Sequence, residues 1–144
     1  MDWWRVRAAV NALNGSTALG LGVAAVGRAE VRRGPRGLLL ATGYRLRFPV
    51  AGAFTVGDVV LTRHDPDWWR TRERMLAHEE RHAWQWAMSL GLPMLPLYGA
   101  AAAWSYLRGG DWSTYNVFET GAGLADGGYA TVSRRERLRR ARAA

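Results

Sequence analysis

The pattern of apolar and polar positions changes along the chain, from a short helix through a β-rich stretch to a helical second half. An apolar run at 18–26 follows two N-cap candidates, Ser16 and Thr17, and is followed by Gly27, as expected of a short buried helix. β-Branched and aromatic residues concentrate at 53–62 (AFTVGDVVLT), the best strand candidate, in which the Gly-Asp pair would form a bulge. The first half therefore predicts a short helix and a small sheet.

Helix signals dominate the second half. The dipeptide Asp65-Pro66 suits the start of a helix, because aspartate can cap the first turn and proline fits within it. The pattern predicts three helices, at about 68–90, at 96–107, and from about 112–115 through 126.

Together these elements predict an α+β fold, with a short antiparallel sheet followed by a long helix and further C-terminal helices. A chain of 144 residues is long enough for one domain with its own core. We expect this domain to cover 1–133, with an N-terminal helix and β-rich part at 1–64 and a helical part at 65–133. A basic tail follows at 134–144.

One long segment, 87–107, carries no charged residue and by length alone would suggest a transmembrane span. Gly91, Pro93 and Pro96 divide it into two pieces that are too short to cross a membrane. A buried helix–turn–helix is the favoured interpretation. Contact with a membrane surface stays open as an alternative, because eight tryptophans are many for this length and tryptophan favours interfaces.

The net charge of +8 comes entirely from arginine, and six of the twenty arginines lie at 134–142. Such a tail would contact an anionic membrane surface, or would simply be a solvated terminal helix. Nucleic acid is a less favoured partner, because the chain has no recognisable nucleic-acid-binding motif. No clear signal-peptide cleavage site follows Arg5 and Arg7, so we expect a cytoplasmic protein, with membrane association as the alternative.

Two of the three histidines, His78 and His82, stand four positions apart in HEERH, which fits the H-E-x-x-H pattern. A helix advances about 100° per residue, so both imidazoles lie on one face and can bind one small cation such as Zn²⁺. Glu79 lies beside that face, within reach of a metal-bound water, whereas Glu80 lies opposite and should face solvent. Gln85 returns to the histidine face, either to orient a ligand or, as we favour, to satisfy a buried carbonyl.

A catalytic zinc site needs a third protein ligand and one open position for water. Cysteine is absent, which excludes thiolate ligands and disulfides. Glu119 is the best candidate, because its neighbours are apolar and a buried carboxylate needs a partner. Asp126 lies seven positions later on the same predicted helical face, where it would accept the second N–H of a ligand histidine or cap the helix end. His64 precedes the motif in a loop and fits the rim of the site.

These residues resemble a known group. The motif HEERH with a downstream E-x-x-A at Glu119 resembles the gluzincin-type zinc metallopeptidases, in particular their minimal bacterial versions. The strand candidate at 53–62 followed by LAHEERHAWQ is similar to small bacterial domains that pair such a strand with an H-E-x-x-H-x-x-Q helix. The similarity covers 53–129, about half of the chain.

The resemblance implies a small zincin-like domain in which His78, His82 and Glu119 bind zinc. It also implies a sheet edge at 54–61, along which an extended peptide would pair as an added strand. Gly123 stands where larger gluzincins often carry an acidic residue. The candidates for stabilising an oxyanion, without ranking, are Tyr129, Tyr98 and His64.

We therefore expect a zinc metallopeptidase whose metal-bound water hydrolyses a peptide or amide bond of a peptide or protein substrate. Glu79 would act as the general base, taking the proton from water and passing it to the leaving amine, while the metal polarises the carbonyl. Two alternatives stand beside this expectation. One is a non-catalytic domain in which a metal or hydrogen bonds tie two helices together. The other is an arginine-rich binder of an anionic membrane surface or of nucleic acid.

Overall fold

The computed structural model describes residues 2–49, 51–129 and 139 of the chain. The chain divides into two compact units, Met1–Met94 and Leu95–Ala144. Apart from Arg139, the predicted basic tail lies outside the described residues, so its contacts stay a prediction. The predicted extent of a single domain over 1–133 also stays a prediction.

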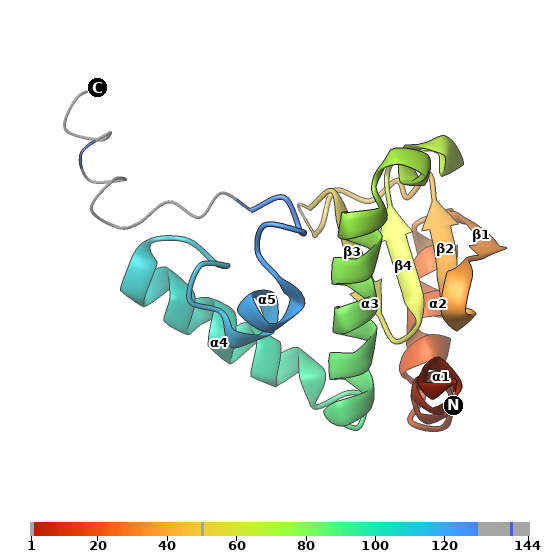
Figure 1. The fold of residues 1–144 in the computed structure, drawn as a ribbon, viewed down its shortest axis with the longest axis horizontal. Coiled ribbons are helices and arrows are strands. Elements are labelled where there is room, and N and C mark those ends of the chain that lie inside the picture. The colour runs from red at the N-terminus through yellow and green to blue at the C-terminus, as the bar shows by residue number, and fades with distance from the viewer. Residues whose placement is uncertain (1, 50, 130–138, 140–144) are drawn as a thin grey trace. The chain divides into compact units, whose positions relative to one another are not determined.

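The first unit contains a four-stranded sheet (Figure 1). Its strands are β1 (Glu30–Arg33), β2 (Leu39–Thr42), β3 (Ala53–Val56) and β4 (Val59–Thr62). The order across the sheet is β1-β2-β4-β3, in which β2 and β4 are parallel and the other two pairs are antiparallel. The predicted α+β class is confirmed, but the prediction of an antiparallel sheet is wrong, because β2 and β4 run parallel. The sheet is mixed because the connection between β2 and β3 places the β3–β4 pair beside β2. The strand of that pair that lies next to β2 is β4, and it runs parallel to β2.

The helices of the described part surround this sheet or follow it. In chain order they are α1 (Trp3–Leu13), α2 (Ser16–Val26), the short 3-10 helices η1 (Pro35–Gly37) and η2 (Pro66–Thr71), α3 (Glu73–Met88), α4 (Met94–Gly109) and α5 (Val117–Ala122).

The predicted single strand at 53–62 is in fact a β-hairpin. Val56 lies opposite Val59 in the antiparallel pairing, so Gly57 and Asp58 form a two-residue turn rather than a bulge. Gly57 has a φ of +62°, a conformation that glycine adopts without strain and that tight hairpin turns require. The strand β3 lies at the sheet edge and β4 is internal, so only the first half of the predicted peptide-docking segment is at an edge.

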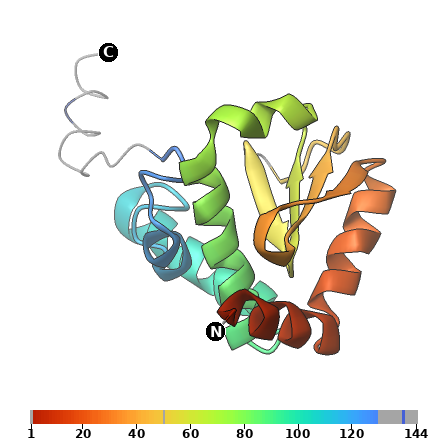
Figure 2. The same cartoon turned by 45° about the vertical axis from the view of Figure 1, so that its right-hand side comes forward.

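Apolar side chains alternate between the two faces of the sheet, and each face has its own small core. Val59 and Leu61 pack with Ala24 of α2, whereas Val60 between them packs with Ala83 of α3. The sheet thus lies between α2 and α3, as Figure 2 shows. Because successive residues of a strand point to opposite faces, this alternation fixes which strand residues meet the histidine helix. Thr55 is one of them.

Three helix boundaries differ from the predictions. Asp65 does cap a helix, since its side chain accepts a hydrogen bond from the backbone N–H of Trp68, but that helix is η2, and α3 begins separately at Glu73. Gly15, rather than Ser16 or Thr17, is the N-cap of α2. The last predicted helix ends early: α5 stops at Ala122, because Gly123 adopts a φ of +91°. The expectation that Asp126 continues the helical face of Glu119 is therefore wrong.

Replacing the two interior glycines of α2 by alanine is expected to have opposite effects on the stability of the protein. A Cβ atom on Gly20 would clash with the backbone oxygen of Val56 and lie 2.8 Å from Val59, whereas one on Gly22 would meet nothing within 4 Å. We expect Gly20→Ala to destabilise the protein by about 1–3 kcal/mol through overpacking, and Gly22→Ala to stabilise it by about 0.5–1 kcal/mol through helix propensity. Urea denaturation would measure both. Equal effects of the two substitutions would contradict this packing of α2 on the hairpin.

A buried arginine links α1 to the far side of the histidine helix. Arg7 is 0% exposed, and its guanidinium donates to Asp58 at 2.7 Å, to Glu80 at 2.8 Å and to the carbonyl of Arg36 at 2.6 Å. Arg36 donates to Glu80 as well, at 2.7 Å. The expectation that Glu80 faces solvent is therefore wrong, because α1 and η1 pack against that side of α3. Asn11, one turn after Arg7, donates to the carbonyl of Ala83 at 2.9 Å and adds a second polar link.

Burial and hydrogen bonding act in opposite directions on the two acids of this network. Burial raises the pKa of the Asp58 carboxyl, which Arg7 only partly offsets. Burial also acts to raise the pKa of Glu80, but the hydrogen bonds from Arg36 and Arg7 outweigh it and hold that pKa below its ordinary value. The network is thus a buried set of charges whose members depend on one another.

Within the described residues, no single helix is both long and apolar enough to cross a membrane. α1 and α2 satisfy the length and composition criteria only as a pair, bent by 73°. The predicted helix–turn–helix at 87–107 is present as the end of α3 and most of α4, but the expectation that it is buried is wrong. Leu97 and Leu107, for example, are 50% and 79% exposed, because α4 is apolar on nearly all sides and only one stripe of it is covered.

Candidate metal centre

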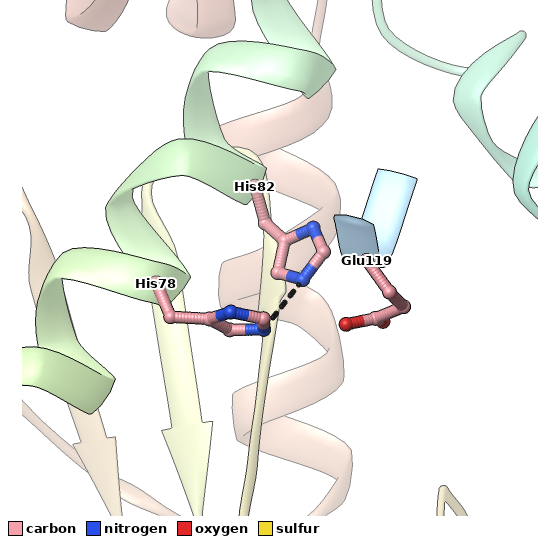
Figure 3. A group of neighbouring side chains, drawn as sticks. All are labelled: His78, His82 and Glu119. Atoms are coloured by element: carbon pink, nitrogen blue, oxygen red, sulfur yellow. Dashed lines mark hydrogen bonds between the residues drawn. The ribbon is translucent and has the colours of Figure 1, made fainter. Parts of the chain in front are cut away.

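The helix α3 places His78 and His82 on one face, as the i, i+4 spacing predicts. Their Nε2 atoms are 3.0 Å apart, and both side chains are buried, at 2% and 8% exposure. Figure 3 shows the two imidazoles side by side, with the dashed line joining these nitrogens. Two nitrogens at about 2.0–2.1 Å from one tetrahedral Zn²⁺ would lie about 3.3 Å apart. The observed separation therefore needs to change by only a few tenths of an ångström to suit an ion.

Gln85 contacts the outer nitrogen of a candidate ligand. Its Oε1 lies 2.8 Å from Nδ1 of His82, so the amide oxygen can accept the Nδ1–H and leave Nε2 with its lone pair available. This contact supports the alternative interpretation, in which Gln85 orients a ligand, and the favoured role of satisfying a buried carbonyl stays a prediction. Hydrogen bonds of this kind fix the tautomer and ring orientation of metal-binding histidines.

Glu79 is buried between the histidine helix and the edge strand. It is 4% exposed, and the hydroxyl of Thr55 donates to its Oε2 at 2.7 Å. Trp86 in turn donates its indole N–H to the carbonyl of Thr55 at 2.9 Å. The carboxylate is therefore held by a strand residue that is itself anchored to the same helix. Sequence reasoning missed Thr55, although its place in the period-2 pattern of β3 puts it on the face toward α3.

Glu119 lies in the short helix α5 of the second unit and is 2% exposed. The hydroxyl of Tyr98 in α4 donates to its Oε1. Asn116 caps α5, because its side chain accepts the backbone N–H of Phe118. The predicted burial of this carboxylate is thus confirmed. Tyr98, an unranked oxyanion candidate in the sequence, proves to be a hydrogen-bond partner of the carboxylate.

The loop before α5 is ordered around Asp111, whose Oδ1 accepts the backbone N–H groups of Ser113 and Thr114 at 2.9 and 2.7 Å. Burial acts to raise the pKa of the Asp111 carboxyl, but these hydrogen bonds outweigh it and hold the pKa well below its ordinary value. Ser105 of α4 accepts the next amide, that of Tyr115, at 2.8 Å. These contacts fix the chain just before the helix that carries Glu119.

Among the described residues, His78, His82 and Glu119 form a group that could hold a metal ion. Each offers one ligand atom, and these atoms all lie within 4.8 Å of one another (Figure 3). All three residues are buried. Two imidazole nitrogens and one carboxylate oxygen form a donor set that suits Zn²⁺, so the residues present fit the predicted ion.

Comparison of the chain with protein-family models, with curated proteins and with solved structures finds no match. Support for a metal centre therefore comes from the positions and burial of these side chains. The resemblance to gluzincin-type metallopeptidases stays a prediction.

Two further residues singled out in the sequence are His64 and Tyr129. His64 follows β4 in a loop, as predicted, where its ring stacks on Trp68 with ring centroids 4.5 Å apart. Tyr129 is half-buried, and its backbone N–H donates to the carbonyl of Leu124. Tyr98, the third oxyanion candidate, donates its hydroxyl to the candidate ligand Glu119.

Proposed function

We propose that the protein is a zinc-dependent hydrolase that cleaves a peptide or similar amide bond. The observation that carries the proposal is the buried group of His78, His82 and Glu119, which offers three ligand atoms within 4.8 Å of one another. Three protein ligands leave one position of a tetrahedral ion open, which is the arrangement of catalytic rather than structural zinc sites. Zinc is the proposed ion because its preferred ligands are of these two kinds.

The buried surroundings support catalysis as well as binding. A zinc ion held here would lower the pKa of a coordinated water to about 7 and polarise a substrate carbonyl. Interactions among charges are stronger in such a water-poor site than at the surface. Gln85 would keep His82 in the tautomer that ligates through Nε2, and Tyr98 would orient the carboxylate of Glu119.

Glu79 would serve as the general base of this reaction. It follows a ligand histidine directly, so its position on α3 lies beside the face of the imidazoles. The hydrogen bond from Thr55 holds the carboxylate in one orientation, which a proton-accepting group needs in order to meet its substrate water repeatedly. The side chain would take the proton from water and pass it to the leaving amine.

The position of the strand β3 favours a peptide as the substrate. It lies at the edge of the sheet, and its residue Thr55 contacts the proposed base. An extended peptide that paired with β3 as an added strand would run past Glu79, so that its scissile bond could meet the candidate metal centre.

Zinc-dependent cleavage of a peptide mixture tests the proposal. We expect the zinc-loaded full chain to cleave a subset of peptides in a proteome-derived mixture, as followed by mass spectrometry. Dialysis against a chelator should abolish that cleavage, and added zinc should restore it, because the ion supplies the electrophile. Cleavage that survives removal of the metal would refute the proposed chemistry. Zinc binding without cleavage would favour the alternative, a non-catalytic domain stabilised by a metal.

A further inference from the structure

The outer face of α4 is apolar and uncovered. Its large exposed side chains are Leu95, Leu97, Trp104, Tyr106 and Leu107, with exposures between 49% and 79%. The covered positions of the same helix include Met94, Ala102 and Ser105. Exposed apolar surface of this extent on a helix marks an interaction site rather than ordinary surface composition.

The exposed residues occupy too wide an arc for a helix that docks into one groove. At about 100° per residue, the positions from Leu95 to Leu107 that are exposed spread over about 200° of the helix, and the covered ones fall in a stripe of about 100°. An ordinary surface helix has polar residues over the arc that its core stripe leaves exposed. An apolar arc of about 200° is instead suited to a medium that surrounds the helix on several sides, as lipid does.

The charged and aromatic residues of this segment are also placed as expected for a helix in contact with lipid. No aspartate or glutamate occurs at 81–110, where Arg81 and Arg108 are the charged residues. The guanidinium of Arg108 lies over the rings of Trp104 and Tyr115, at 6.0 and 4.9 Å from their centroids. Tyr106 stacks on the exposed Trp112 at 4.5 Å. Tryptophan, tyrosine and arginine together at one end of an apolar segment are typical of the boundary between lipid and water.

We propose that α4 binds the surface of a lipid membrane that contains anionic headgroups. The apolar arc would enter the outer part of the hydrocarbon, and the cluster around Arg108 would lie at headgroup level. The helix has 16 residues and is thus about 24 Å long, shorter than the roughly 30 Å hydrocarbon core, so it lies along the membrane surface. The net charge of +8 favours anionic lipid. This inference is independent of the proposed hydrolysis.

Flotation of the full chain with phospholipid vesicles tests the inference, using seven parts phosphatidylcholine to three parts phosphatidylglycerol as the probe. The doubly substituted variant Trp104→Glu/Leu107→Glu should partition at least about tenfold more weakly than the wild type, because it loses two apolar anchors. The control Leu13→Glu/Val26→Glu adds the same charge at positions that are 89% and 71% exposed in the first unit. It should bind within about twofold of the wild type. Circular dichroism would confirm that both variants fold.

Three outcomes would overturn the inference. The first is a wild type that does not float with these vesicles. The second is an equal loss of vesicle binding in the two glutamate variants. A loss of binding that occurs only when the six tail arginines are replaced with glutamine has the same meaning, because both results would assign binding to charge alone. The third is self-association of the wild type, abolished by Trp104→Glu/Leu107→Glu, without vesicle binding. That result would assign the face to a second copy of the chain.

Discussion

Replacing Glu79 by glutamine is expected to lower kcat for peptide hydrolysis by about 10²–10⁴-fold while the protein keeps its metal. General acid–base catalysis contributes a factor of this size, and an amide side chain cannot take a proton from water. Glutamine has nearly the same shape and can still accept the hydrogen bond that Thr55 donates to this side chain. The measurement is kcat on a peptide identified from the mixture, together with zinc content.

The matched control for this experiment is Glu73→Gln in the same helix. Glu73 lies in the first turn of α3 and is exposed, so its substitution makes the same chemical change away from the candidate centre. We expect the control to keep kcat within about twofold. If Glu79→Gln retained full activity, another group would have to be the base.

Replacing Arg7 by alanine is expected to reduce the free energy of unfolding by about 3–5 kcal/mol, the largest effect on stability that we predict. The substitution leaves Asp58 buried without its guanidinium partner, and removing one member of a buried ion pair typically costs this much. Chemical denaturation of the full chain at neutral pH would measure it.

The control is Arg5→Ala, which removes an arginine two positions before Arg7 in the same helix, α1. The side chain of Arg5 is 70% exposed and pairs with Asp2 at 3.2 Å. Exposed pairs contribute little, so we expect a loss below about 1 kcal/mol. A similar small loss for Arg7→Ala would mean that the network is not a buried charge cluster in solution.

The sequence predicts the local parts of this fold well. The position of the histidine helix, its approximate end and the pairing of His78 with His82 follow from periodicities within one turn or two. The sequence also contains a signal for the hairpin, because a Gly-Asp pair between strand-like runs is typical of a hairpin turn. If Gly57-Asp58 is interpreted as a bulge, the segment is predicted to form one strand, whereas it forms two strands joined by a turn.

The errors about the surroundings of single side chains concern contacts between residues far apart in the chain. Helical geometry places Glu80 opposite the histidines, but it cannot reveal that Arg7, 73 positions earlier, lies buried against that side. The bond between Thr55 and Glu79 spans 24 positions and depends on how β3 packs on α3. The sequence favours a buried carbonyl as the partner of Gln85 and does not reveal its contact with His82, because both roles require only a place on the same face of the helix. Apolar content alone also could not show that the outer arc of α4 is left uncovered.

The zinc content of the purified full chain tests the metal centre most directly. We expect the wild type to hold about one zinc per chain after dialysis against metal-free buffer, and Glu119→Ala to hold less than about a tenth of that, because a three-ligand site that loses one ligand binds far more weakly. His64→Ala, which removes the histidine outside the group, should keep the full content. A folded Glu119→Ala variant that still held one zinc per chain would contradict the assignment of this carboxylate as the third ligand.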